Sequence, residues 1–196
     1  MKLRYEGFSP GTQEVLADAY TMMASKLGNT LQDGAAMTRW FGAADRTRLF
    51  RYLNMMAAVV RDPNRTLTFV NRIDAKLKVE YKSLYNPQLL PVGHDGLELD
   101  GTYAYAFPTD RRSEIGPMGA SGLMSHVGSG MRIYIANSFF GAPAEERAWT
   151  VYHELTHKVL ATEDHSYDPG TCLGFAAQPA KAMNNAENYG LFWRDC

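Results

Sequence analysis

The sequence predicts an α+β fold, in which a helical N-terminal part precedes a small, mostly antiparallel sheet and two further helices. Apolar residues recur at three- and four-residue spacings in the first third of the chain, short runs of β-branched and aromatic residues follow, and helical spacing returns after Pro143. The sequence contains no internal repeat, low-complexity tract or long linker. We therefore expect residues 1–196 to form a single domain, helical over 1–64 and carrying the sheet and the later helices over 65–196.

Two helices are expected in the N-terminal portion. The first covers about 11–27 and is followed by the stop signal Gly28-Asn29, and its apolar face holds Val15, Leu16, Tyr20, Met23 and Leu27. The second covers roughly 45–61 and ends before Asp62-Pro63, and its apolar face holds Leu49, Leu53, Met56 and Val60.

Three strands are expected after these helices, over residues 66–70, 103–107 and 132–136. Each run is short, rich in β-branched or aromatic residues, and bounded by Gly, Pro or Asn. Residues 108–131 are rich in Gly, Ser and Met and have the composition of a long loop. The strand over 132–136 is the candidate edge on which an extended peptide could pair.

The C-terminal part is expected to hold a helix over about 144–160, a loop from Ala161 to about Thr171, and a last helix over about 179–193. Pro143 precedes the first of these helices, and Glu145 and Glu146 lie in its first turn, where the helix dipole favours acidic side chains.

Charge and hydropathy exclude some classes of partner. A formal net charge of −1 gives no reason to expect nucleic acid or an anionic membrane as a partner. The longest apolar run is six residues, Met55–Val60, which is too short for insertion into a membrane. The N-terminus has no apolar core of signal-peptide length. The two cysteines, Cys172 and Cys196, are compatible with one disulfide or with two thiols.

The segment His153-Glu154-Leu155-Thr156-His157 lies inside the expected helix over 144–160. Residues four positions apart share a helix face, so both imidazoles can bind one metal ion. Neutral imidazole suits Zn²⁺, and a site with two or three protein ligands plus water is typical of a catalytic zinc. Glu154 lies beside the first ligand, where its carboxylate can reach a water activated by the metal. The pattern predicts a zinc-dependent hydrolase with Glu154 as general base.

A third protein ligand is needed, and spacing alone leaves three candidates. A third histidine six residues after His157 is excluded because Glu163 occupies that position. The downstream loop offers Asp164 and His165, and the last helix offers Glu187.

Residues 161–168, Ala-Thr-Glu-Asp-His-Ser-Tyr-Asp, resemble the GTxDxxYG signature of the deuterolysin and peptidyl-lysine metalloendopeptidase family, the aspzincins. The segment 185–189, Asn-Ala-Glu-Asn-Tyr, is similar to the NADSY-type segment of that family, and further similar segments extend the resemblance from about residue 10 onward. Two glycines of the signature are replaced, by Ala161 and Asp168, and the run from His157 to Asp164 is about two residues shorter than usual.

The resemblance implies a zincin-like metallopeptidase domain with one zinc ion per chain. It implies that His153, His157 and Asp164 bind the metal and that Tyr167 assists the transition state. It also implies that Glu187 faces the substrate residue just after the cut, which predicts a loose preference for Lys or Arg there. The preference is loose because a second acid of the lysine-specific members is replaced by Gly190.

Two other functions remain open. One is an exported toxin-type zinc hydrolase that acts on peptidoglycan cross-links or on one target protein, and the other is a non-catalytic zinc-containing binding domain. The intact Glu154 argues against the second, since a scaffold needs no base. We expect a peptide or protein substrate, an inhibitor or immunity protein as a further partner, and an exported or extracellular location.

Overall fold

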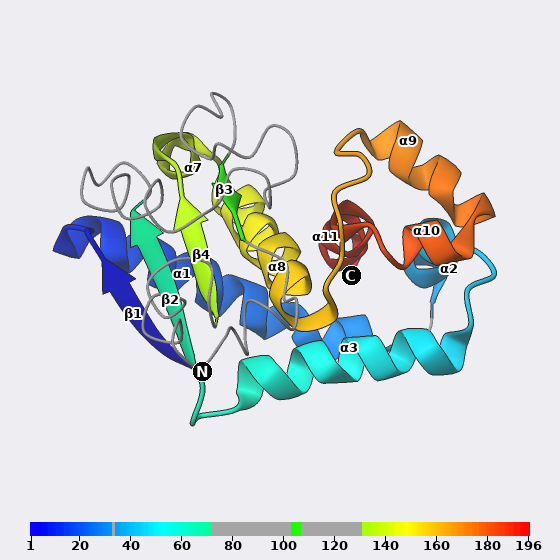
Figure 1. Ribbon diagram of the computed structural model, residues 1–196, viewed down its shortest axis with the longest axis horizontal. Coiled ribbons are helices and arrows are strands. Elements are labelled where there is room, and N and C mark those ends of the chain that lie inside the picture. Colours follow the sequence, from blue (N-terminus) through cyan, green and yellow to red (C-terminus); the bar gives the residue numbers. More distant parts are fainter. Residues whose placement is uncertain (33, 72–102, 107–130) are drawn as a thin grey trace, which may run out of the picture.

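The computed structural model describes residues 1–32, 34–71, 103–106 and 131–196. Most of the expected loop over 108–131 lies outside these residues. Figure 1 shows the sheet on one side of the molecule and the C-terminal helices on the other, with helix α8 (Ala144–Leu160) between them. Among the described residues, no helix is long and apolar enough to cross a membrane.

The two predicted N-terminal helices are confirmed as α1 (Pro10–Ser25) and α3 (Arg46–Arg61). A 3-10 helix, η1 (Lys26–Leu31), continues α1 through the expected stop signal. A short helix that was not predicted, α2 (Ala35–Phe41), lies between η1 and α3.

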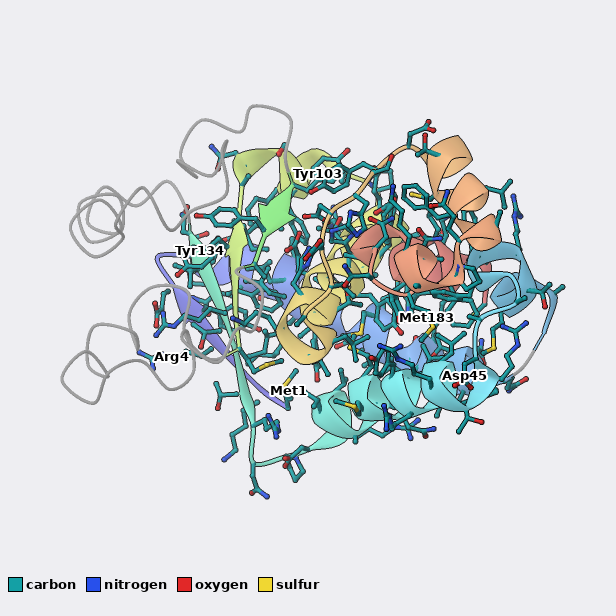
Figure 2. The ribbon with its side chains drawn as sticks, turned by 45° about the vertical axis from the view of Figure 1, so that its right-hand side comes forward. Met1, Arg4, Asp45, Tyr103, Tyr134 and Met183 are labelled. Atoms are coloured by element: carbon teal, nitrogen blue, oxygen red, sulfur yellow. The ribbon has the colours of Figure 1, made fainter. Side chains whose placement is uncertain are left out.

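Polar contacts hold the two ends of α3, and Figure 2 labels Asp45 at one end and Met1 near the other. At its start, Asp45 Oδ1 accepts hydrogen bonds from the backbone N–H groups of Thr47 and Arg48, at 2.9 and 3.2 Å. This side-chain cap satisfies N–H groups that have no partner within the helix. Near its end, the Val60 carbonyl accepts from the N-terminal ammonium group of Met1 at 2.7 Å. The contact ties the start of the chain to the end of α3.

The sheet has the strand order β1-β2-β4-β3. Its strands are β1 (Lys2–Glu6), β2 (Thr66–Asn71), β3 (Ala104–Tyr105) and β4 (Arg132–Ile135). The three predicted strands are present, and β1 was not predicted. Only Leu3 and Tyr5 of this short edge strand pack on the core, so its sequence carries a weak pattern.

The prediction of a mostly antiparallel sheet is wrong. β1 pairs with β2 and β2 pairs with β4 in parallel, and only β3 and β4 are antiparallel. The connection from β1 to β2 carries α1, α2 and α3, and a crossover of this length returns the chain in the same direction.

The C-terminal part begins with α7 (Asn137–Gly141) and continues with α8, which has the predicted bounds. The structure then places α9 (Pro169–Gly174), the 3-10 helix η4 (Phe175–Ala177), α10 (Pro179–Ala182) and α11 (Ala186–Asp195) in chain order. The single last helix predicted over 179–193 is therefore two helices. The break occurs because Asn185 has extended backbone, with φ −100° and ψ 117°, and α11 begins anew after it.

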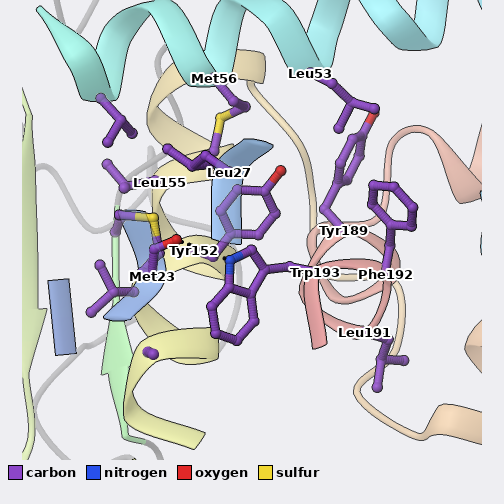
Figure 3. Close-up of a cluster of buried hydrophobic side chains, with 14 of the residues drawn as sticks. Met23, Leu27, Leu53, Met56, Tyr152, Leu155, Tyr189, Leu191, Phe192 and Trp193 are labelled. Atoms are coloured by element: carbon purple, nitrogen blue, oxygen red, sulfur yellow. Dashed lines mark hydrogen bonds between the residues drawn. The ribbon is translucent and has the colours of Figure 1, made fainter. Parts of the chain in front are cut away.

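The core lies around α8, which packs against α1, α3, α11 and strands β3 and β4. Figure 3 shows Tyr152 and Leu155 of α8 among side chains from α1, η1, α3 and α11, namely Met23, Leu27, Leu53, Met56, Tyr189 and Trp193. All of them are buried. The packing on several sides makes α8 a rigid support for the side chains on its remaining face. Both cysteines are free thiols, Cys172 in the core and Cys196 at the end of the chain.

Candidate metal centre

Helix α8 places His153 and His157 one turn apart on the same face. Their ring centroids lie 5.1 Å apart, and the two residues are 4% and 2% exposed. Because both rings are held inside the fold, little rotamer freedom is lost when they bind an ion. The helical placement of these two predicted ligands is as expected.

The loop after α8 brings Asp164 to the two histidines. Asp164 Oδ1 lies 3.1 Å from His153 Nε2 and 3.3 Å from His157 Nε2. One ligand atom from each of the three residues lies within 4.8 Å of the others, which makes them a candidate metal site. Two imidazole nitrogens and one carboxylate oxygen fit the ligand preferences of zinc.

The other ring nitrogens of the two histidines have their own acceptors. Nδ1 of His153 donates to Glu187 Oε2 at 2.9 Å, and Nδ1 of His157 donates to the Thr162 carbonyl oxygen at 2.7 Å. With the proton held on Nδ1, each ring would be neutral once an ion had displaced the proton from Nε2, and the Nε2 lone pair would bind that ion. Carboxylate and carbonyl partners of this kind orient metal-binding histidines.

The charges of this cluster support one another. Burial opposes protonation of His153, but hydrogen bonds to Asp164 and Glu187 outweigh it and raise its pKa to about 10. Burial also opposes ionisation of Asp164, but hydrogen bonds from His153 and His157 outweigh it and hold the Asp164 pKa well below its ordinary value. The cluster therefore favours an ionised Asp164, which is the form that binds a metal ion.

The other two candidates for the third ligand lie elsewhere. His165 Nε2 contacts Glu163 Oε2 at 3.6 Å and Asn184 Nδ2 at 3.2 Å, and it is not part of the candidate metal group. Glu187 is 2% exposed and bonds to the far side of the His153 ring. The structure thus brings Asp164, and neither His165 nor Glu187, to the Nε2 atoms of the two histidines.

Glu154 lies on α8 beside these residues and is 4% exposed. Burial raises its pKa to about 7, although the nearby histidines act in the opposite direction. Its Oε2 is buried without a hydrogen-bond partner among the described residues. An unpaired buried oxygen is costly in a purely structural role, so it marks a group available to a ligand or water.

Tyr167 lies at the surface of the same site. Its ring stacks on that of His153, with centroids 5.7 Å apart and an interplanar angle of 20°. The side chain is 63% exposed, and its hydroxyl group hydrogen bonds with Asp164. Tyr167 therefore contacts both a histidine and the carboxylate of the candidate metal site while remaining accessible to a substrate.

The expectation that residues 132–136 form the edge for a bound peptide is wrong. The strand order places β4 between β2 and β3, so the edge on this side of the sheet is β3. Ala106, which follows β3, donates its backbone N–H to the Glu154 carboxylate. Among the described residues, the sheet edge beside the candidate base is therefore that of residues 104–105.

Ala161, which ends α8, has left-handed backbone, with φ 55° and ψ 39°. This conformation is strained for a residue with a Cβ atom, and glycine adopts it freely. We expect Ala161→Gly to raise the free energy of unfolding by about 1 kcal/mol, measured by urea denaturation. Ala58→Gly, at an exposed position inside α3, is the control and should lower it by about 1 kcal/mol. Equal destabilisation by both changes would contradict the assignment of strain to Ala161.

Comparison with known proteins agrees with this geometry. Residues 123–194 match the model of the aspzincin M35 family, described as lysine-specific metallo-endopeptidase. A solved structure of a zinc peptidase from Grifola frondosa has the same fold, with a TM-score of 0.63, 20% sequence identity, and coverage of 96% of this chain and 97% of that one. No curated protein sequence matches the chain. Residues 123–194, the part of the chain that matches this family model, include the whole candidate metal site.

Proposed function

We propose that the chain is a zinc-dependent endopeptidase in which His153, His157 and Asp164 hold one zinc ion. The observation that carries the proposal is the convergence of three ligand atoms within 4.8 Å of one another. Three protein ligands of the nitrogen and oxygen type are typical of catalytic zinc, whereas structural zinc is usually closed by four.

Glu154 is the proposed general base. Zinc, when bound, supplies a Lewis acid that polarises the scissile carbonyl group. Glu154 takes a proton from the water that attacks the carbonyl carbon, and then delivers it to the amine nitrogen as the C–N bond breaks. A pKa of about 7, raised by burial, suits a carboxyl group that must accept and release a proton near neutral pH.

The substrate is proposed to lie in extended form along the edge of β3. Main-chain pairing with residues 104–105 would bring a peptide carbonyl beside Glu154, because Ala106 already contacts that carboxylate.

Tyr167 is the proposed donor to the oxyanion that develops on the carbonyl. We expect Tyr167→Phe to lower kcat by about 100-fold and to change KM little, because the hydrogen bond is made in the transition state. Steady-state kinetics on a fluorogenic peptide, with thermal unfolding of both proteins, provide the measurement. A loss of stability with unchanged kcat would show that Tyr167 only packs on His153.

Glu187 is proposed to position His153. The preference for Lys or Arg was expected from a carboxylate facing the substrate, but Glu187 is buried and bonded to His153 Nδ1. A side chain at Gly190, where the second acid would stand, would collide with the indole nitrogen of Trp149. We therefore propose that selection for a basic residue after the scissile bond is weak.

Glu187→Gln distinguishes the two roles. If Glu187 positions His153, the change should weaken zinc binding by about 10-fold, since the acceptor remains but its charge is lost. The cleavage-site profile on a digested proteome should then stay the same. Enrichment of Lys and Arg that disappears in Glu187→Gln would instead assign the residue to substrate binding.

The proposed function is tested on protein purified without added metal. We expect close to one zinc per chain by elemental analysis, and casein hydrolysis that is lost with a chelator and restored by zinc. Activity that survives chelation in a zinc-free protein would overturn the proposal, and bound zinc without hydrolysis of any substrate would favour the binding domain. Cleavage of purified peptidoglycan with casein left intact would identify an exported toxin-type hydrolase instead of a general exported peptidase.

A further inference from the structure

The loop that carries Asp164 has no helix or strand of its own between α8 and α9. Two backbone hydrogen bonds fasten it to the start of α11 just before Asp164. Glu163 N–H donates to the Asn184 carbonyl at 2.8 Å, and Ala186 N–H donates to the Glu163 carbonyl at 2.9 Å. This short parallel bridge holds one side of Asp164.

The side chain of Asn185 holds the other side. Its Oδ1 accepts from the backbone N–H groups of His165 at 2.8 Å and Ser166 at 3.3 Å, and its Nδ2 donates to the Ser166 carbonyl at 3.3 Å. The backbone N–H groups of His165 and Ser166 can only donate, so the oxygen of the Asn185 amide, and not its nitrogen, must face them. Asp164 therefore lies between two anchors that come from residues 184–186.

The Asn185 side chain bonds to this loop and not to the first turn of its own helix. An asparagine at a helix N-cap usually accepts from the first turn of its own helix, but Asn185 caps α11 without any such bond. It is fully buried, and its Nδ2 is also within hydrogen-bond distance of Asn188 Oδ1, at 2.8 Å, and Cys172 Sγ, at 3.3 Å. These contacts prevent the amide from rotating toward the helix.

We infer that Asn185 is a positioning residue, whose side-chain amide holds the loop 163–166 so that Asp164 meets His153 and His157. The inference rests on the proposed metal site. A carboxylate on an unanchored loop would have to be ordered each time an ion binds, and the cost of ordering would reduce the affinity. The Asn185 amide orders the loop before the ion binds, so this cost is not incurred on binding.

The test measures zinc affinity by competition with a chromophoric chelator. Asn185→Ala should weaken zinc binding by about 10- to 100-fold, the range found when partners of metal ligands are removed. With cobalt in place of zinc, the visible absorption of the variant should change in shape or intensity, because the position of one ligand changes.

Asn188→Ala is the matched control. Asn188 is an equally buried amide one turn along α11, but its Nδ2 donates to the carbonyl groups of Trp40 and Cys172. It should cost similar stability and leave zinc affinity within about threefold, because it removes one contact of Asn185 Nδ2 but leaves the bonds from Asn185 to His165 and Ser166 in place. Equal zinc affinity of wild type and Asn185→Ala would overturn the inference, as would an equal loss in both variants.

A measurement on the unaltered chain covers the case in which Asn185→Ala does not fold. Amide hydrogen exchange at His165 and Ser166 should be slow in the zinc-free protein as well as in the zinc-bound protein. Unprotected exchange in the zinc-free protein would mean that the ion, and not Asn185, orders the loop. If the wild type binds no zinc at all, the proposed function fails, which is a separate outcome from failure of the Asn185 inference.

Discussion

Glu154→Gln is expected to lower peptidase turnover by about 10²- to 10⁴-fold while leaving zinc bound. The substitution keeps the shape of the side chain and removes the carboxylate that accepts the proton of the attacking water. The two α8 histidines and Asp164, the proposed ligands, are unchanged, so zinc content should remain close to that of the wild type. Single-turnover rates on a fluorogenic peptide measure the loss of turnover, and elemental analysis of the same sample measures the zinc content.

Glu145→Gln is the control for this result. Glu145 lies in the first turn of the same helix, and its exposed carboxylate pairs with Lys26 at 3.1 Å. Exposed pairs contribute little, so turnover should stay within about twofold. A Glu154→Gln enzyme that keeps a large fraction of wild-type turnover would show that another group is the base.

Asp164→Ala should weaken zinc binding by more than about 100-fold, a larger loss than that expected for removal of a residue that only orients a ligand. The change deletes the carboxylate that contacts Nε2 of both histidines, and the two imidazoles alone form a weaker site. Chelator competition gives the affinity, and residual activity should scale with the zinc content.

Glu163→Ala provides the comparison for Asp164→Ala. Glu163 is the neighbouring acid of the same loop, and its side chain is 65% exposed and directed to His165. Its backbone anchors remain in the variant, so zinc affinity should be unchanged. If Asp164→Ala binds zinc as tightly as Glu163→Ala does, then a ligand other than Asp164 completes the site.

The elements that depend on local periodicity could be predicted from the sequence. α8 has the expected bounds because its apolar spacing, its acidic first turn and Pro143 all agree. The sheet topology could not be predicted in the same way. Strand direction depends on the path of the whole connection, and the edge position of β3 depends on which strands pair, so neither property is carried by a strand's own residues.

The break between α10 and α11 shows the same limit. Residues 183–185 would continue a helix by pattern alone, but the Asn185 side chain bonds to a loop about twenty residues earlier. Long-range hydrogen bonds of this kind override local propensity. The role of Glu187 could not be predicted for a similar reason. Its position in a helix does not reveal whether its carboxylate contacts a substrate or the ring of His153.

The sequence by itself determined the chemistry of the α8 face. His153 and His157 are four residues apart with Glu154 beside the first, and any α-helix with this spacing presents two adjacent imidazoles and a carboxylate. Spacing alone left the third residue open, and the tertiary structure decided which candidate joins the two histidines. Asp164, Glu187 and His165 are all close enough in sequence to be candidates. The loop reaches the Nε2 atoms with Asp164 because residues 184–186 hold it there, and α11 delivers Glu187 to Nδ1 of His153 instead.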